Sequence, residues 1–124
     1  MRENSITLKS TPSGRAFMQF IAMLNTGDEE RLSEFIGKRF SAEVLADYSV
    51  DELVTYCMTV YNETGGMRIH KVFLSQEFTM MVVMKAIRDD VEVLFLDRLK
   101  VETVQPHNIL EYVHQEFNAA DYGG

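Results

Sequence analysis

The chain has 124 residues, which is about the length of one ordinary domain, and 46% of them are hydrophobic and 25% charged, as in folded globular proteins. A net charge of −7 without a basic stripe disfavours nucleic acid and an anionic membrane surface as partners. The single cysteine, Cys57, cannot form an internal disulfide, and no Cys and His spacing suggests a metal site, so we expect neither metal nor cofactor. The chain has no apolar run of about 20 residues and no signal-peptide pattern, which indicates a cytoplasmic protein.

Residues 1–10 are polar and aperiodic, and we expect them to form a flexible leader. A helix is predicted to begin at Thr11 and Pro12, because threonine caps helices and proline suits the first helical position. We expect this helix to end at Gly27. Its apolar residues recur at helical spacing and predict one buried stripe, formed by Phe17, Phe20, Ile21 and Leu24.

Three further helical segments are predicted. Asp28 caps a short helix that we expect to end at Gly37, and a further helical turn is predicted over residues 41–47, after Ser41. Ser49 and Glu52 have the spacing of a capping box, in which each side chain bonds the backbone amide of the other. The helix that follows has its apolar face on Leu53, Tyr56, Cys57, Val60 and Tyr61 and is expected to end at Gly65-Gly66.

The periodicity changes after Gly66, where β-branched, aromatic and methionine residues become dominant. Four strands are predicted, at about 67–74, 77–88, 91–102 and 106–117. The connections between them are too short for crossover helices, so the sheet is expected to be an antiparallel meander. Helices followed by strands define an α+β fold, with a single domain at 11–117 and a flexible tail at 118–124.

The two middle strands can be paired residue by residue. If Asp89-Asp90 is a two-residue turn, the numbers of facing residues sum to 179, although a longer loop is also compatible with the sequence. One face of this hairpin then carries five pairs that are apolar except for Asp97: Phe78–Val101, Met80–Leu99, Val82–Asp97, Met84–Phe95 and Ala86–Val93. Because a one-residue slip would exchange the two faces, the pattern supports this register and predicts that the apolar face packs on the helices.

Asp97 is the anomaly in that apolar face. A buried carboxylate needs hydrogen bonds or a raised pKa, and an inward acid in an apolar hollow is what a general base requires. The alternative interpretation is a structural Asp bonded to a Tyr hydroxyl or to backbone amides.

The register of the last strand decides which residues lie beside Asp97. A two-residue turn at Val104-Gln105 places Asp97 opposite Tyr112 and Phe95 opposite His114, which gathers an acid, a phenol and an imidazole. A three-residue connection instead turns the row of Ile109, Val113 and Phe117 onto that face, and the sequence leaves both registers open.

The second face of the hairpin is mixed, but it is still rich in apolar residues: Met81, Val83, Ile87, Leu94 and Leu96. An apolar area of this size is expected to be buried against another surface, most simply a second copy of the chain. A homodimer through the sheet is therefore expected. The long stems of Lys85, Arg98 and Lys100 are an alternative cover.

Four short motifs, in this order along residues 11–117, resemble the nuclear transport factor 2-like superfamily and especially its SnoaL-like members: Thr11-Pro12-x-Gly-Arg15, Phe20-Ile-Ala-Met-Leu-Asn-Thr-Gly-Asp28, Gly65-Gly66 and Pro106-His107-Asn-Ile109. The resemblance implies a curved antiparallel sheet that wraps around the helices as a cone with an apolar pocket, and homodimers through the sheet. The superfamily includes ketosteroid isomerase, scytalone dehydratase and polyketide cyclases, and also many domains without catalysis. The fold therefore does not decide the function.

Two functions follow as expectations. The first is a binding or interaction module that holds a small apolar molecule in the cone pocket, with no nucleic acid and no membrane as partner. We expect the pocket to be lined by Phe17, Phe20, Leu24, Tyr56, Val60, Met80, Val82, Met84, Phe95 and Leu99. The second is a small lyase, isomerase or cyclase that uses Asp97 as general base with Tyr112 or His114 as its partner, since cyclase-like members of the superfamily use an inward acid near an inward His.

Overall fold

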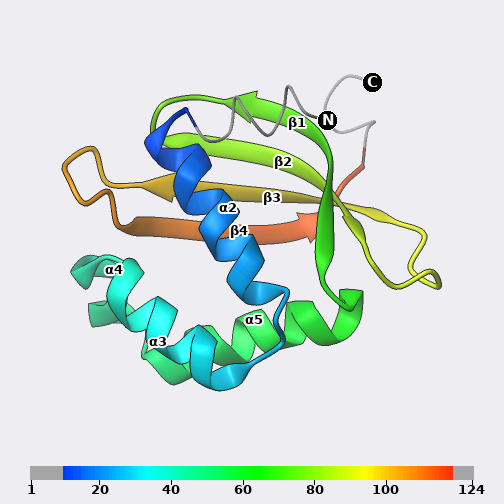
Figure 1. Ribbon diagram of the computed structural model, residues 1–124, viewed down its shortest axis with the longest axis horizontal. Helices are drawn as coiled ribbons and strands as arrows, with labels where there is room; N and C mark the ends of the chain where they lie inside the picture. Colours follow the sequence, from blue (N-terminus) through cyan, green and yellow to red (C-terminus); the bar gives the residue numbers. More distant parts are fainter. Residues whose placement is uncertain (1–9, 119–124) are drawn as a thin grey trace.

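The structure is a computed structural model in which residues 10–118 are described, so most of the expected leader and tail lies outside the described residues. Helices come first and strands second, and Figure 1 shows α2 lying across the sheet while α3, α4 and α5 lie along its β4 side. The α+β class is confirmed. The elements are α2 (Pro12–Leu24), α3 (Glu29–Arg39), α4 (Ala42–Asp47), α5 (Val50–Thr64), β1 (Met67–Ser75), β2 (Thr79–Ala86), β3 (Leu94–Val101) and β4 (Ile109–Glu116).

The predicted helix caps are present. The hydroxyl of Thr11 accepts a hydrogen bond from the amide of Gly14 at the start of α2. Ser49 and Glu52 form the complete capping box of α5, with both bonds at 3.0–3.1 Å. Gly65 ends α5 at φ +69°, a left-handed conformation that glycine adopts without steric cost.

The predicted end of the second helix at Gly37 is wrong, because α3 continues through Gly37 to Arg39. A glycine inside a helix costs only about 1 kcal/mol relative to alanine, so it does not end a helix that is held by packing. Leu32 and Ile36 on the inner side of α3 are fully buried and supply that packing. The chain turns at Phe40 and enters α4, where Ser41 is the N-cap.

The sheet has the strand order β1-β2-β3-β4, and every pair is antiparallel. The predicted register of the middle hairpin is confirmed from Thr79 opposite Lys100 to Lys85 opposite Leu94. The two-residue turn is wrong, because the strands separate after these pairs and residues 87–93 form a longer loop. The amides of Ile87 and Arg88 donate instead to carbonyls of Gly66 and Thr64, which ties this loop to the end of α5.

The register of β4 differs from both registers that the sequence left open. Asp97 lies opposite His114 and Leu99 opposite Tyr112, which is a shift of two residues from the first register. Because side chains alternate with a period of two, this shift keeps Tyr112 and His114 on the face of Asp97. An irregularity beside Leu110 then brings Ile109 onto the same face, where it is fully buried.

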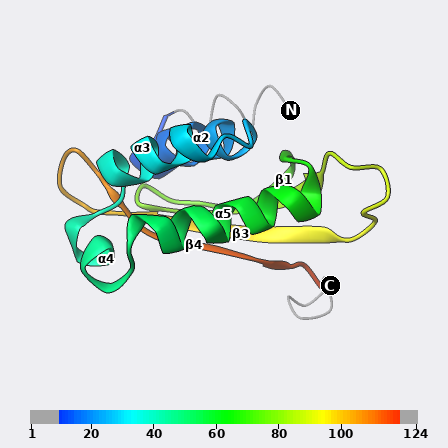
Figure 2. The same cartoon turned by 90° about the horizontal axis from the view of Figure 1, so that it is seen from below.

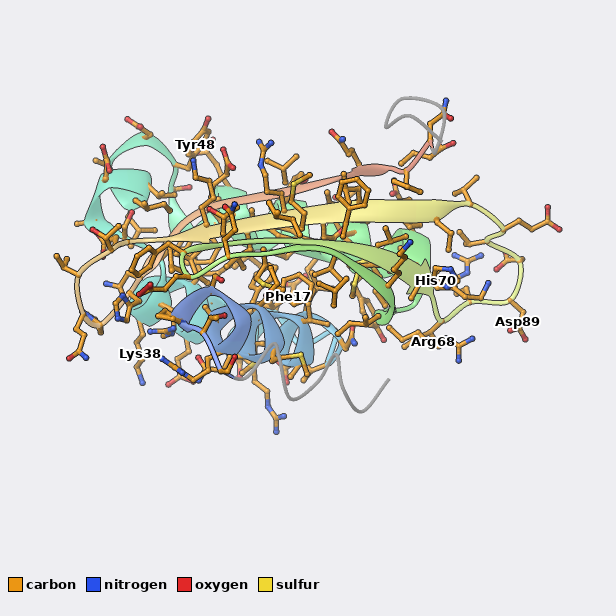
Figure 3. All side chains as sticks on the ribbon, turned by 90° about the horizontal axis from the view of Figure 1, so that it is seen from above. Phe17, Lys38, Tyr48, Arg68, His70 and Asp89 are labelled. Carbon is orange, nitrogen blue, oxygen red and sulfur yellow. The ribbon has the colours of Figure 1, made fainter. Side chains whose placement is uncertain are left out.

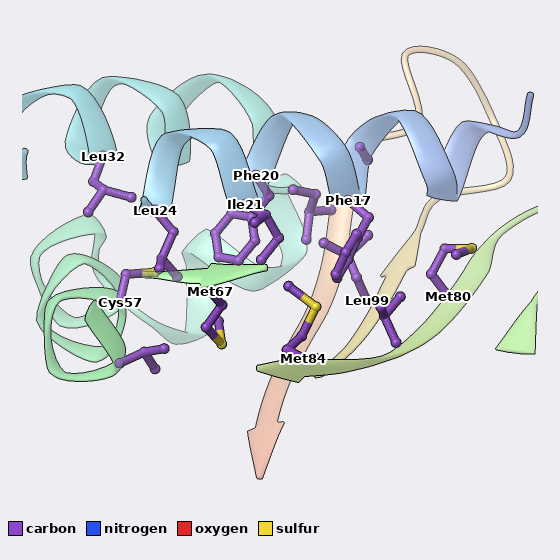
Figure 4. Close-up of a cluster of buried hydrophobic side chains, with 14 of the residues drawn as sticks. Phe17, Phe20, Ile21, Leu24, Leu32, Cys57, Met67, Met80, Met84 and Leu99 are labelled. Atoms are coloured by element: carbon purple, nitrogen blue, oxygen red, sulfur yellow. The ribbon is translucent and has the colours of Figure 1, made fainter. Parts of the chain in front are cut away.

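The apolar face of the sheet packs against the helices, as predicted. Figure 2 shows α2 and α3 on one side of the strands, and Figure 3 shows Phe17 pointing from α2 toward the strands. Figure 4 shows the resulting cluster between α2, α5 and the strands. Nine of the ten residues that we expected to line a cone pocket belong to this packed core: Phe17, Phe20, Leu24, Val60, Met80, Val82, Met84, Phe95 and Leu99.

The second face of the sheet is already largely covered within one chain. Val83 and Leu96 are each only 2% exposed, while Met81 and Leu94 are half-buried and Ile87 is exposed. The ring of Phe73 in β1 lies 6.1 Å from that of Phe117, which follows β4. The apolar area left for a partner is therefore smaller than the sequence pattern suggested.

Candidate functional site

The carboxylate of Asp97 is the centre of a buried polar cluster. Asp97 is fully buried in the middle of β3, and both of its oxygens accept hydrogen bonds from β4. The Tyr112 hydroxyl donates to Oδ2 at 2.6 Å, and Nδ1 of His114 is 2.7 Å from Oδ1. The structure thus brings together the three residues that the sequence proposed as catalytic. Their roles in a reaction stay a proposal.

His114 is held from several sides. Its side chain is 8% exposed, and its ring stacks on Phe95 with centroids 4.5 Å apart. Its backbone amide donates to the Tyr56 hydroxyl at 3.1 Å. Because a carboxylate only accepts, Nδ1 carries the proton of the bond to Asp97. The other ring nitrogen, Nε2, is buried and has no hydrogen-bond partner among the described residues. It is the atom at which this ring can exchange a second proton.

Tyr112 is locked as a hydrogen-bond donor. Burial, and next the negative charge of Asp97, raise the pKa of Tyr112 well above its ordinary value, so the phenol keeps its proton. The edge of its ring meets Phe20 at a centroid distance of 4.4 Å, and Tyr56 lies 6.0 Å away on another side. This packing fixes the ring over the core and aims its hydroxyl at Asp97.

A cavity of about 790 Å³ opens beside this cluster, between α4, the first half of α5 and the strand pair β3–β4. Its size is within the range of sites that hold small molecules. Aromatic and aliphatic side chains dominate the lining, and carboxylates and one amine come from the more exposed positions. The lining residues are Phe40, Glu43, Val44, Asp47, Tyr48, Glu52, Leu53, Tyr56, Cys57, Lys100, Leu110, Glu111, Tyr112 and Val113.

Tyr112 connects the cavity with the buried cluster. It lines the cavity and also donates to Asp97, whereas neither Asp97 nor His114 is among the lining residues. Of the ten residues predicted to line a pocket, only Tyr56 lines this one. The contribution of α4 to the cavity was not predicted from the sequence. A usable signal was the four-residue spacing of Val44 and Tyr48, which is typical of one helix face, although Tyr48 is the C-cap of α4 and not part of the helix.

Cys57 lines the cavity with a buried thiol. Its thiol is buried, and burial raises its pKa to about 12, so it stays protonated near neutral pH. A protonated thiol is a poor nucleophile and a poor metal ligand. Within residues 10–118, no three His, Cys, Asp or Glu side chains are grouped so that they could hold a metal ion.

Comparison with protein-family models, with curated proteins and with solved structures finds no match. In the part of the chain that the structure describes, no helix combines the length and apolar character that crossing a membrane requires.

Proposed function

We propose that this protein binds a small, largely apolar molecule in the cavity between α4, α5 and β4. The observation that carries the proposal is the composition of that cavity, in which Phe40, Leu53, Tyr56 and Leu110 supply apolar and aromatic surface. Sites of this kind bury a ligand against apolar walls and orient it with few polar groups. Tyr112 provides a rigid part of the wall, because its hydroxyl and ring are fixed by Asp97 and Phe20.

A neutral fluorescent probe, N-phenylnaphthylamine, tests this proposal. We expect a saturable rise in its fluorescence with the native chain and loss of that rise in Val44→Trp, which fills the cavity from α4. Val93→Trp is the matched control, because Val93 is exposed in the β2–β3 loop at the other end of the molecule (Figure 1). Equal probe binding by the two variants, with both folded by circular dichroism, would contradict the proposal.

A second candidate function is acid–base chemistry by the buried cluster, as in a small lyase, isomerase or cyclase. The observation that favours it is Nε2 of His114, which is buried and has no hydrogen-bond partner within residues 10–118, while Nδ1 is bonded to Asp97. In such a pair the carboxylate orients the imidazole, and Nε2 takes a proton from a carbon acid and later returns it. Since Nε2 is enclosed in this conformation, the reaction requires a local opening beside it.

Deuterium exchange at the activated carbon of β-tetralone, followed by NMR, tests the second candidate. General acid–base catalysis contributes roughly a hundredfold or more, so His114→Gln is expected to lower the exchange rate by about that factor. His70→Gln is the control, because His70 is exposed on β1. Exchange that is equally fast in both variants, or no faster than in buffer, would rule out this function.

We also propose membership in the nuclear transport factor 2-like superfamily and a homodimer through the sheet. The helices-first order, the four-stranded meander and the inward acid support the first part. Half-buried Met81 in β2 and Leu94 in β3 support the second. Sedimentation equilibrium tests the dimer: Leu94→Lys, a change in β3, should dissociate it, whereas Val104→Lys, a change at an exposed loop position, should not. A monomeric native chain would refute it.

A further inference from the structure

A second cavity, of about 390 Å³, lies where three elements meet: the start of α2, the end of α3 and the loop between β3 and β4. Its lining is polar and differs in kind from that of the larger cavity. Side chains from α2 (Arg15 and Gln19), from α3 (Arg39) and from the loop (Gln105 and His107) contribute to it.

The charge of this cavity is opposite to that of the protein. The chain carries a net charge of −7. Among residues 10–118, however, the ionisable side chains that line the cavity are Arg15, Arg39 and His107, and none of these described lining residues is a carboxylate. Gln19 and Gln105 add amide groups that can donate. A concave site with several donors and positive charge fits an anion, and guanidinium groups fit oxyanions best because their N–H groups form a planar fork.

Arg39 is positioned by the contact between α3 and β4. It is the last residue of α3, and the next residues are fixed to β4 by the bridge between Phe40 and Ile109 and by the bond from the Ser41 amide to the Ile109 carbonyl at 2.9 Å. Its Nη1 lies 3.4 Å from the Pro106 carbonyl, which brings the guanidinium to the loop. Its Nε is buried and has no hydrogen-bond partner among the described residues. A buried donor without a partner is costly. Because Nε is enclosed in this conformation, an anion in the cavity reaches it only after a turn of the guanidinium, and the bond formed then removes this cost.

The other basic groups are held on rigid supports. Arg15 and Gln19 are four residues apart on α2 and therefore share one face of that helix. The His107 ring is fixed by a 2.9 Å hydrogen bond between its Nδ1 and the Glu102 carbonyl. Because a carbonyl only accepts, Nδ1 donates there, and Nε2 is the ring nitrogen left for a ligand.

We propose that this cavity is a binding site for a phosphate-type oxyanion, held by Arg39 with Arg15 and His107. Arg39 contributes the planar donor group, and Arg15 contributes a second positive charge. The protonated imidazole of His107 donates from Nε2 to a further oxygen of the anion. The site is separate from the cavity of the proposed function, with which it shares no lining residue. Its test is therefore independent of that proposal.

Titration calorimetry of the full chain with inorganic phosphate, at constant ionic strength set with chloride, tests the site. We expect saturable binding by the native chain and an affinity lower by about tenfold or more in Arg39→Gln, since that variant loses the positive charge and its charge-assisted hydrogen bonds to the anion. Arg31→Gln is the matched control, because it removes the same charge from an exposed position of the same helix. Arg31→Gln should bind as the native chain does.

Two further measurements secure the result. Arg39→Lys keeps the positive charge but lacks the planar set of N–H donors of the guanidinium. We expect it to bind phosphate more weakly than the native chain and more tightly than Arg39→Gln. If Arg39→Gln fails to fold by circular dichroism, Arg15→Gln replaces it with the same expectation, because Arg15 is exposed on α2. Absence of saturable binding, or equal binding by folded Arg39→Gln and Arg31→Gln, would overturn the proposal, since either result leaves only nonspecific attraction of ions.

Discussion

Tyr112 donates its hydrogen bond to Asp97 diagonally across the sheet. The residue directly opposite Asp97 is His114, and Tyr112 lies opposite Leu99, yet the Tyr112 hydroxyl reaches Oδ2 of Asp97 at 2.6 Å. One carboxylate of β3 thus accepts from two successive inward side chains of β4. This arrangement satisfies both oxygens of a fully buried acid.

Removal of the Tyr112 hydroxyl should therefore cost stability. In Tyr112→Phe the ring still packs on Phe20, but Oδ2 of Asp97 is left buried without its donor. An unsatisfied buried acceptor costs about 1–3 kcal/mol, and we expect this decrease in the free energy of unfolding, measured by urea denaturation. Tyr48→Phe is the control, because Tyr48 is 55% exposed, and its stability should stay within about 0.5 kcal/mol of the native value. Similar losses in the two variants would argue against the hydrogen bond.

Asp97 and His114 should be energetically coupled. Asp97→Ala leaves the His114 Nδ1 without its acceptor, and His114→Ala leaves Oδ1 of Asp97 without its donor, so each single change disrupts the same bond. A double-mutant cycle of unfolding free energies should give an interaction energy of roughly 0.5–3 kcal/mol. Additive losses, within the error of the cycle, would show that the 2.7 Å contact contributes nothing to stability.

Cys57 should make the protein less stable in alkali. Its pKa is about 12 in the folded chain against an ordinary value of 9.0, so above about pH 9 the unfolded chain releases a proton that the folded chain keeps. The free energy of unfolding that this thiol contributes is fully present below pH 9 and is lost as pH rises toward 12. The greatest slope for one group is about 1.4 kcal/mol per pH unit.

Urea denaturation of the native chain and of Cys57→Ala between pH 7 and about pH 10 measures this effect, and the variant should show the smaller decrease. Tyr56 and Tyr112, whose pKa values are also raised, remain in both proteins and do not affect the difference at the lower end of this range. Rapid reaction of the native thiol with a disulfide reagent at pH 8 would be inconsistent with a buried, protonated Cys57.

Two glycines should respond to alanine in opposite directions. Gly37 lies inside α3 with open space around its added Cβ, so Gly37→Ala should stabilise the protein by about 0.5–1 kcal/mol. Gly65 has φ +69°, and its added Cβ would lie 2.6 Å from Cγ of Arg88, so Gly65→Ala should destabilise it by about 1–3 kcal/mol. Thermal and urea unfolding of both variants measures the difference, and a loss of stability in Gly37→Ala would contradict the observed extent of α3.

The sequence alone was sufficient wherever the deciding interactions are local or strictly periodic. The caps at Thr11 and Ser49 join residues three apart, so their pattern is visible in the chain itself. The pairing of Val82 with Asp97 follows from alternation with a period of two, because a slip by one residue would expose one entire apolar face. The rule that glycine ends a helix fails at Gly37, because packing of Leu32 and Ile36 stabilises α3 as far as Arg39.

Only the tertiary structure decided the register of β4 and the place of the cavity. Either of the two alternating faces of β4 could have packed on the core. An irregularity beside Leu110 lets Ile109 and Tyr112 both face inward, which neither regular register allows. The expected pocket residues fill the space beneath α2 as a packed core, while the cavity forms where α4 and α5 meet the edge of the sheet. Both outcomes depend on how elements far apart in the sequence pack together, which hydrophobic periodicity within single elements does not encode.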